Sequence, residues 1–152
     1  MKRLRHLLDL SAAERLLLIK ALLVLIVVRL SLLILPFGTF CRRWGSLIAR
    51  AGMRPPRQSL PPRRVVWLTS VASRYVPGAH CLARSFAAHL MLAQHGHRAR
   101  MQIGVRKNDG RMEAHAWLEY RGVPLFESET HVEGFSLLTS ISPWPENPGI
   151  AR

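Results

Sequence analysis

The sequence predicts an α+β fold in which helices precede a small antiparallel sheet. Two observations carry this prediction. Long apolar and amphipathic segments typical of helices fill the first half of the chain. The second half contains two alternating segments joined by Asn108-Asp109-Gly110, which is typical of a hairpin turn. With 152 residues, 49% of them hydrophobic, the chain is long enough for one domain with a buried core and an N-terminal helical arm.

The first expected helix runs from about residue 12 to residue 34 or 35. Ser11-Ala12-Ala13-Glu14 matches a capping box, in which the Ser11 hydroxyl and the Glu14 carboxylate accept hydrogen bonds from each other's backbone N–H groups. Pro36 is expected to end the helix, because proline disfavours helical geometry in the residue before it.

This helix is apolar on almost every side. Only three polar residues interrupt its central part: Lys20, Arg29 and Ser31. Three locations therefore compete. Packing on the rest of the domain or on a partner is favoured over a contact with a membrane surface. A transmembrane span comes third, because Lys20 and Arg29 would both lie within the hydrocarbon.

Two more helices and a connector are expected before the hairpin. Phe37–Ala51 predicts an amphipathic helix that ends at Gly52, since apolar residues recur there at helical spacing. Those residues are Phe40, Trp44, Leu47 and Ile48. Val65–Tyr75 predicts a helix that ends before Pro77. Residues 53–64, rich in Pro and Arg, predict an extended and semi-rigid connector.

The connector divides the chain into regions of different composition. We expect an N-terminal hydrophobic and basic helical region over residues 1–52, the connector over 53–64, and a catalytic domain over 65–142. Residues 143–152 contain three prolines and predict a frayed C-terminal tail.

The net charge of +13 belongs almost entirely to the first half. Residues 1–75 hold 14 Lys and Arg against two acids, whereas residues 76–152 hold 8 Lys and Arg against 7 acids. Such a surface favours an anionic partner, such as lipid head groups, an acidic protein or nucleic acid. We expect no nucleic acid, because no recognition motif or platform of aromatic and basic residues is present. A solvated basic surface explains the charge equally well.

The cysteines and histidines predict no metal site and no cofactor. Cys41 and Cys81 are 40 positions apart and form no CxxC motif, so neither a zinc site nor a disulfide framework is indicated. Four histidines match no ligand spacing: His80, His89, His95 and His97. No small-residue cleavage site follows the N-terminal apolar segment, so we expect no cleaved signal peptide. A reducing, cytoplasmic location is expected, with membrane association as an alternative.

The predicted site is organised around Cys81. Pro77-Gly78 predicts a turn before it, and the next residues predict a helix that runs to about His95 and closes at Gly96. A thiol in the first turn of a helix lies near unpaired N–H groups and the positive end of the helix dipole, which stabilise its thiolate. His115, on the second alternating segment, would complete the thiol–imidazole pair of cysteine catalysis.

The alternation of segments 98–107 and 111–120 predicts the register of the hairpin. With Asp109-Gly110 as the two-residue turn, one side is apolar and pairs Met101 with Leu118. The other side carries two pairs of opposite charge, which are Arg106 with Glu113 and Arg100 with Glu119.

This register places Gly104 opposite His115. Because glycine has no side chain, we expect open space above the imidazole, where a thiol or a substrate could approach. The competing interpretation is a buried Cys81 and a sheet histidine that never meet, since free cysteines are commonly core residues.

A third residue usually orients the imidazole of such a pair, and Glu127 and Glu129 are the candidates. A third strand is expected over Val123–Glu127, where Pro124 indicates an edge strand or a bulge. With a tight turn at Arg121-Gly122, Glu127 would face away from the imidazole. With a one-residue bulge, both carboxylates would reach it. The oxyanion hole would include the N–H of the nucleophilic cysteine.

Several segments together resemble the lasso peptide biosynthesis B family. They are Val76–Ser85, Ile103-Gly104-Val105 and Ala114–Glu119, with the helix around Glu14–Leu18 and the closing Phe135–Leu138. The resemblance covers nearly the whole chain and is specific in this combination. It is closest to the separately encoded protease half, which has a transglutaminase-like, papain-related fold.

The resemblance implies a cysteine peptidase that removes the leader from a ribosomally made lasso peptide precursor. It makes Cys81 the nucleophile and His115 the general base. The family has an aspartate at the position that Glu127 occupies here, so the third member departs from the family pattern. An acyl transferase of transglutaminase type, a non-catalytic scaffold and a membrane-surface protein are the alternatives.

The resemblance also implies three partners. These are the precursor peptide, a separate leader-recognition protein and an ATP-dependent lasso cyclase. A separate recognition protein is expected because nothing near the N-terminus indicates a small winged-helix-like module. We expect the basic arm to contact these proteins, the peptide or a membrane surface.

Overall fold

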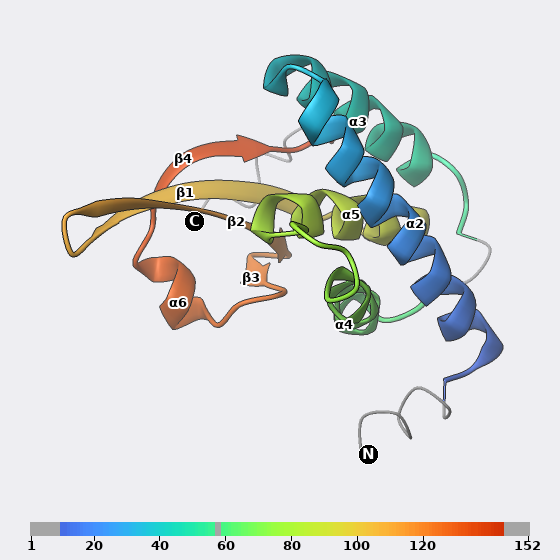
Figure 1. The fold of residues 1–152 in the computed structure, drawn as a ribbon. Coiled ribbons are helices and arrows are strands. Elements are labelled where there is room, and N and C mark those ends of the chain that lie inside the picture. Colours follow the sequence, from blue (N-terminus) through green and yellow to red (C-terminus); the bar gives the residue numbers. More distant parts are fainter. Residues whose placement is uncertain (1–9, 57–58, 145–152) are drawn as a thin grey trace.

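The computed structural model describes residues 10–56 and 59–144, apart from the side chain of Glu129. Helices α2 to α5 precede a four-stranded antiparallel sheet of order β3-β2-β1-β4, so the α+β prediction is confirmed (Figure 1). The elements are α2 (Ala12–Ile34), α3 (Phe37–Gly52), α4 (Pro62–Ser73), α5 (Cys81–Gln94), β1 (Arg100–Asn108), β2 (Arg111–Tyr120), β3 (Val123–Pro124), α6 (Glu129–Glu133) and β4 (Ser136–Ile141).

The predicted helices form within a few residues of their expected ends. The capping box begins α2, because the Ser11 side chain accepts from the Glu14 N–H and the Glu14 carboxylate accepts from the Ser11 N–H. Helix α4, predicted from Val65, begins earlier, at Pro62, because a proline is favourable in the first turn of a helix.

Helix α5 is at the centre of the core. It lies against β1 and β2, and α2, α3 and α4 each contact it (Figure 1). Phe40 of α3 and Phe86 of α5 are fully buried, and their ring centroids meet edge to face at 4.7 Å. The N-terminal helices therefore share one hydrophobic core with the helix that begins at Cys81.

Helix α2 has two apolar faces with different surroundings. By length and composition it is able to cross a membrane, with a mean hydropathy of 2.7. One face is nevertheless buried in the core through Leu17, Ala21, Leu25 and Val28, which are 0–4% exposed. The opposite face carries large apolar side chains that remain exposed.

The hairpin has the predicted register, with Met101 opposite Leu118 and Gly104 opposite His115. Positive φ angles at Asp109 and Gly110 allow the two-residue turn. One predicted charge pair forms, with 2.7 Å between Arg106 Nε and Glu113 Oε2.

The second predicted charge pair has the predicted register but not the expected contact between its side chains. Glu119 does face Arg100 in the register, but its carboxylate accepts hydrogen bonds of 3.0 Å from Gln102 Nε2 and from Trp117 Nε1. Among the described residues no ion pair joins Glu119 to Arg100. The side chains of Gln102 and Trp117 therefore take the place of Arg100 at the carboxylate.

The prediction of open space above His115 is wrong. A Cβ atom on Gly104 would lie 2.9 Å from the Phe135 Cβ and 3.0 Å from the Trp117 ring. Glycine is required here because two aromatic side chains fill the space, so neither a thiol nor a substrate approaches over Gly104.

The third strand is shorter than predicted. Arg121 and Gly122 have positive φ angles and form a tight two-residue turn, so the bulge considered from the sequence is absent there. Strand β3 then ends after Pro124 and lies at the edge of the sheet, as the proline indicated.

Two elements that the sequence analysis did not predict lie between β3 and the predicted tail. After the short helix α6, β4 pairs with β1 and completes the sheet. The predicted tail begins with ordered packing, because Trp144 Nε1 donates to the Ala99 carbonyl at 3.2 Å and the Trp144 ring lies on Gly52. Residues 145–152 of the predicted tail lie outside the described residues.

Candidate active site

Cys81 is the first residue of α5, as predicted. The turn before it includes Gly78, whose φ of +74° favours glycine. The His80 N-cap makes no side-chain hydrogen bond to the helix, so this cap leaves the N–H groups of the first turn free. A partly exposed free thiol thus lies at the N-terminal end of a helix, where backbone N–H groups have no side-chain cap.

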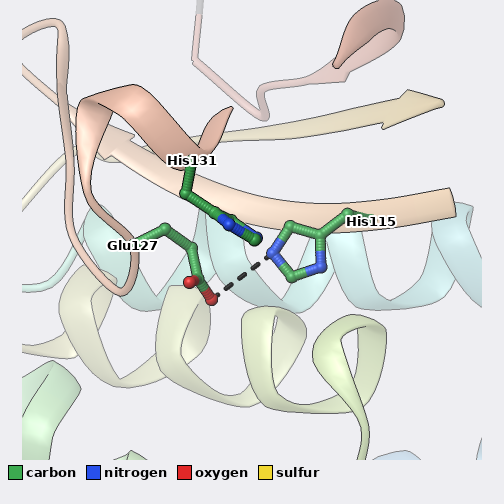
Figure 2. A group of neighbouring side chains, drawn as sticks. All are labelled: His115, Glu127 and His131. Atoms are coloured by element: carbon green, nitrogen blue, oxygen red, sulfur yellow. Dashed lines mark ion pairs between the residues drawn. The ribbon is translucent and has the colours of Figure 1, made fainter. Parts of the chain in front are cut away.

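His115 extends from β2 and is mostly buried, with 16% of its side chain exposed. Its Nε2 lies 3.3 Å from Glu127 Oε1, in an ion-pair contact without the alignment of a hydrogen bond. The second ring nitrogen, Nδ1, points away from Glu127 (Figure 2). The Glu127 carboxylate therefore orients the imidazole at Nε2, and Nδ1 does not face this carboxylate.

Glu127 reaches His115 by a route that neither turn alternative described. The turn is tight and β3 ends at Pro124, but the Leu125 N–H still donates to the Leu118 carbonyl of β2 before the chain bends toward α6. Glu127 lies on this bend, and its carboxylate points at the imidazole (Figure 2). The side chain of Glu129, the other candidate, lies outside the described part of the structure.

Arg84 of α5 holds the same carboxylate from the other side. Its Nη2 lies 3.0 Å from Glu127 Oε1, and its guanidinium carbon lies 4.7 Å above the Phe126 ring centroid. Glu127 is therefore fixed between a guanidinium from the helix and an imidazole from the sheet. Sequence reasoning missed Arg84, although its position three residues after Cys81 puts it on the same helix face.

Ser85 makes a second connection between α5 and β2. Its buried hydroxyl donates a hydrogen bond of 3.0 Å to the carbonyl of Ala116, the residue after His115. Arg84 and Ser85 follow Cys81 by three and four positions, so all three residues share one face of the first two turns. The side chains of α5 that contact Glu127 and the Ala116 carbonyl thus lie one helical turn after Cys81.

Burial lowers the pKa of His115 below its ordinary value. The Glu127 carboxylate opposes this effect, while the positive charges of His131 and Arg84 add to it. The net result favours a neutral imidazole at neutral pH, which is able to accept a proton.

Aromatic rings from the C-terminal segment enclose His115. The ring centroids of His131 and Phe135 lie 5.5 Å and 5.4 Å from that of His115, and Trp117 stacks at 6.2 Å. Sequence reasoning did not assign His131 or Phe135 to the site, because α6 and β4 were not predicted. Their rings contribute to the burial that lowers the pKa of His115.

One group of side chains has the composition of a metal site. Ligand atoms of His115, Glu127 and His131 all lie within 4.8 Å of one another (Figure 2). Two imidazoles and a carboxylate suit Zn²⁺. The Arg84 guanidinium already neutralises the Glu127 carboxylate, and its positive charge would repel a metal cation bound to this group.

Two of the histidines considered from the sequence have structural contacts instead. His89 is buried, its Nε2 lies 2.8 Å from the Ala99 carbonyl, and burial lowers its pKa to about 4. His97 Nε2 lies 2.6 Å from the Leu60 carbonyl. Neither belongs to the group around His115.

A groove of about 590 Å³ begins beside the site. It lies between α4 and the segment that runs from β3 to α6, and Glu127 is part of its wall. Trp67 and Arg63 line the opposite wall. The groove offers an aromatic surface and a positive charge next to the carboxylate that orients His115.

The family comparison agrees with this architecture. The model of the Transglutaminase-like superfamily matches residues 22–140, more than three quarters of the chain, so the protein belongs to this family. Membership suggests a cysteine-dependent activity of peptidase or acyl-transferase type. Comparisons with the curated proteins and with the solved structures found no match.

Proposed function

We propose that this protein is a cysteine peptidase that removes the leader from a ribosomally made lasso peptide precursor. The observation that carries the proposal is the shared face of α5, where Cys81 precedes the two residues whose side chains bond to Glu127 and Ala116. A thiol at an open helix N-terminus and an imidazole oriented by a carboxylate are the groups that peptide-bond cleavage through a thioester requires.

The lasso precursor as substrate rests on the resemblance of the motifs around Cys81 and His115 to the lasso peptide B family. Membership in the Transglutaminase-like superfamily supports thiol chemistry but does not distinguish among its substrates. The groove beside Glu127 supports a peptide substrate, because its volume of about 590 Å³ is sufficient for several side chains and its lining includes Trp67.

In the proposed first step, the Cys81 sulfur attacks the scissile carbonyl. The N–H groups at the start of α5 stabilise the oxyanion. The C–N bond then breaks, and His115 transfers the proton taken from the thiol to the leaving amine. A thioester between Cys81 and the leader remains, since the leader supplies the carbonyl of the cleaved bond.

In the second step, water attacks the thioester. His115 accepts a proton from the water, the C–S bond breaks, and the proton returns to the sulfur. Glu127 keeps the imidazole oriented through both steps, and Arg84 keeps Glu127 in place. The longer side chain of glutamate, in place of the aspartate of the lasso family, spans from the bend after β3 to His115 Nε2.

The proposed partners follow from the same resemblance. A separate leader-recognition protein would deliver the precursor, and an ATP-dependent cyclase would close the ring of the released core peptide. Tethering by the recognition protein would raise the effective concentration of the scissile bond near Cys81, so the groove need not provide all of the specificity.

A transglutaminase-type acyl transfer is the second candidate, because the family and the thioester are common to both reactions. The reactions differ in the acceptor of the acyl group, which is water for a peptidase and an amine for a transferase. A product that contains an added primary amine would identify the transferase.

The test combines the purified protein, the precursor and the recognition protein, and follows the peptide masses. Wild type is expected to release the leader as a free acid. Cys81→Ala is expected to lower the rate by at least about 10³-fold, because the nucleophile is lost. Cys41→Ala is the matched control and should retain activity.

Two results would contradict the proposal. Leader release by Cys81→Ala at the wild-type rate would exclude Cys81 as the nucleophile. An intact precursor in every reaction, with binding to the recognition protein demonstrated, would favour a scaffold without peptidase activity.

A further inference from the structure

The outward face of α2 is an exposed apolar surface on a helix whose other face is buried. Its side chains are between 41% and 76% exposed. They are Leu16, Ile19, Leu23, Ile26, Val27, Leu30, Leu33 and Ile34. Phe37, at the start of α3, continues the surface with 51% exposure. A contiguous apolar surface of this kind marks an interaction site.

The arrangement of residues around α2 has the form of a helix that lies along a surface. At 100° per residue, the exposed apolar side chains cover an arc of about 120°, opposite the buried residues. The helix of 23 residues is about 35 Å long. Lys20 and Arg29 lie near the two borders of the arc, so neither charge is at its centre.

The positive charge of the N-terminal half of the chain favours an anionic partner for the outward face of α2. Residues 1–75 hold 14 Lys and Arg against two acids. On α3, which follows α2 directly, Arg42, Arg43 and Arg50 are exposed. An apolar face on a region of strong net positive charge complements the acyl chains and the negative head groups of an anionic membrane.

We propose that the outward face of α2 binds in the plane of an anionic membrane surface, with the helix parallel to it. The apolar side chains would enter the boundary between head groups and acyl chains, and Lys20 would extend its charge back toward the head groups. The inference rests on exposure and charge and does not depend on the peptidase activity.

Contacts of α2 with the rest of the fold favour this orientation over a span. Crossing the bilayer would withdraw Leu17, Ala21, Leu25 and Val28 from the core, where they are at most 4% exposed. It would also break the ion pair of Glu14 with Arg64 of α4. The guanidinium of Arg29 lies against Gly78, in the turn that precedes Cys81. An in-plane contact keeps all of these interactions.

The experiment is sedimentation of the full chain with phosphatidylcholine vesicles and with vesicles of phosphatidylcholine and phosphatidylglycerol. Wild type is expected to bind the anionic vesicles at least about tenfold more tightly, and to bind less as salt is raised. The double variant Leu23→Glu/Leu30→Glu is expected to lose at least about tenfold in partitioning, because two charges enter the apolar face.

Met112→Glu/Leu138→Glu is the matched control. Both residues are highly exposed, at 68% and 67%, but lie on β2 and β4. The control is expected to bind vesicles as wild type does. Circular dichroism checks the folding of each variant. If the α2 double variant does not fold, Leu23→Trp tests the same contact, with a blue shift of the new emission on vesicles expected.

Three results would overturn the proposal. The first is wild type that remains in the supernatant with anionic vesicles, and the second is Leu23→Glu/Leu30→Glu that sediments as wild type does. A dimer that forms without lipid, dissociates in this double variant and does not bind vesicles would assign the face to a second copy of the chain.

Discussion

Cys41 and Cys81 are both free cysteines of intermediate exposure, and their surroundings are opposite in character. Cys41 lies inside α3, next to the fully buried Phe40, and packs against the hydrophobic core. Burial raises the pKa of the Cys41 thiol and so favours its neutral form. Cys81 begins α5, at a helix end where the N-cap side chain leaves the N–H groups free.

The difference teaches that two cysteines of similar exposure have different surroundings because they occupy different positions in their helices. The interior of α3 offers Cys41 no unpaired donors, since its backbone N–H groups bond within the helix. The start of α5 offers Cys81 several donors and the positive end of a dipole. One thiol packs against the core, and the other begins a helix whose first N–H groups have no side-chain cap.

The largest expected effect tests whether α3, the helix that contains Cys41, is part of the hydrophobic core. Phe40→Ala should lower the free energy of unfolding by about 3–5 kcal/mol, because it removes a buried ring that packs on Phe86. Chemical denaturation measures the change. Phe37→Ala is the control, since Phe37 is 51% exposed and should change stability by less than about 1 kcal/mol. Equal losses for the two variants would contradict the core packing described above.

The next prediction compares the two thiols directly. Iodoacetamide at neutral pH should alkylate Cys81 at least about tenfold faster than Cys41, because burial raises the pKa of the Cys41 thiol and lowers its reactive thiolate fraction. Peptide mapping by mass spectrometry measures both rates in one sample. Cys81→Ser and Cys41→Ser identify each modified peptide. Similar rates at the two positions would remove the chemical distinction between α3 and the start of α5.

The smallest expected effect concerns the imidazole that would serve Cys81. An NMR titration of His115 should give a pKa below its ordinary value of about 6.5, because burial disfavours the charged ring. Glu127→Gln should lower this pKa further, since the carboxylate stabilises imidazolium. Arg84→Gln should raise it, since a positive charge is removed. Each change should be less than about one unit, as the groups are partly solvated.

The same pKa makes a contribution to stability with a definite sign. Because the folded-state pKa lies below that of the unfolded chain, the folded state binds fewer protons. Stability from His115 is therefore present above about pH 6.5 and is lost as the pH falls through the folded-state pKa. In the NMR titration, the two variants should shift the pKa of His115 in opposite directions. A shift in the same direction for Glu127→Gln and Arg84→Gln would contradict the arrangement of charges around the ring.

Most helices and the hairpin followed from the sequence because their determinants are local. The capping box before α2, the turn residues Asp109 and Gly110, and the alternation of the two long strands all act within a few residues. Cys81 at the start of α5 belongs to the same class, since a Pro-Gly turn and a helical segment flank it.

Predictions that needed packing were less successful. The chain leaves β3 two residues after the turn, so Glu127 reaches His115 without a bulge. Gly104 faces aromatic rings rather than open space, because β4 brings Phe135 over it. The short α6 and the exposed β4 gave no periodic signal long enough to predict them.

The sequence alone determined the order of the elements as far as β3, the hairpin register and the placement of a thiol at a helix start, since hydrogen bonding and side-chain alternation are encoded by neighbouring residues. Only the tertiary structure decided that Arg84 and Glu127 meet beside His115 and which face of α2 is buried. These outcomes depend on residues more than ten positions apart, whose contacts form only when the helices and the sheet share one core.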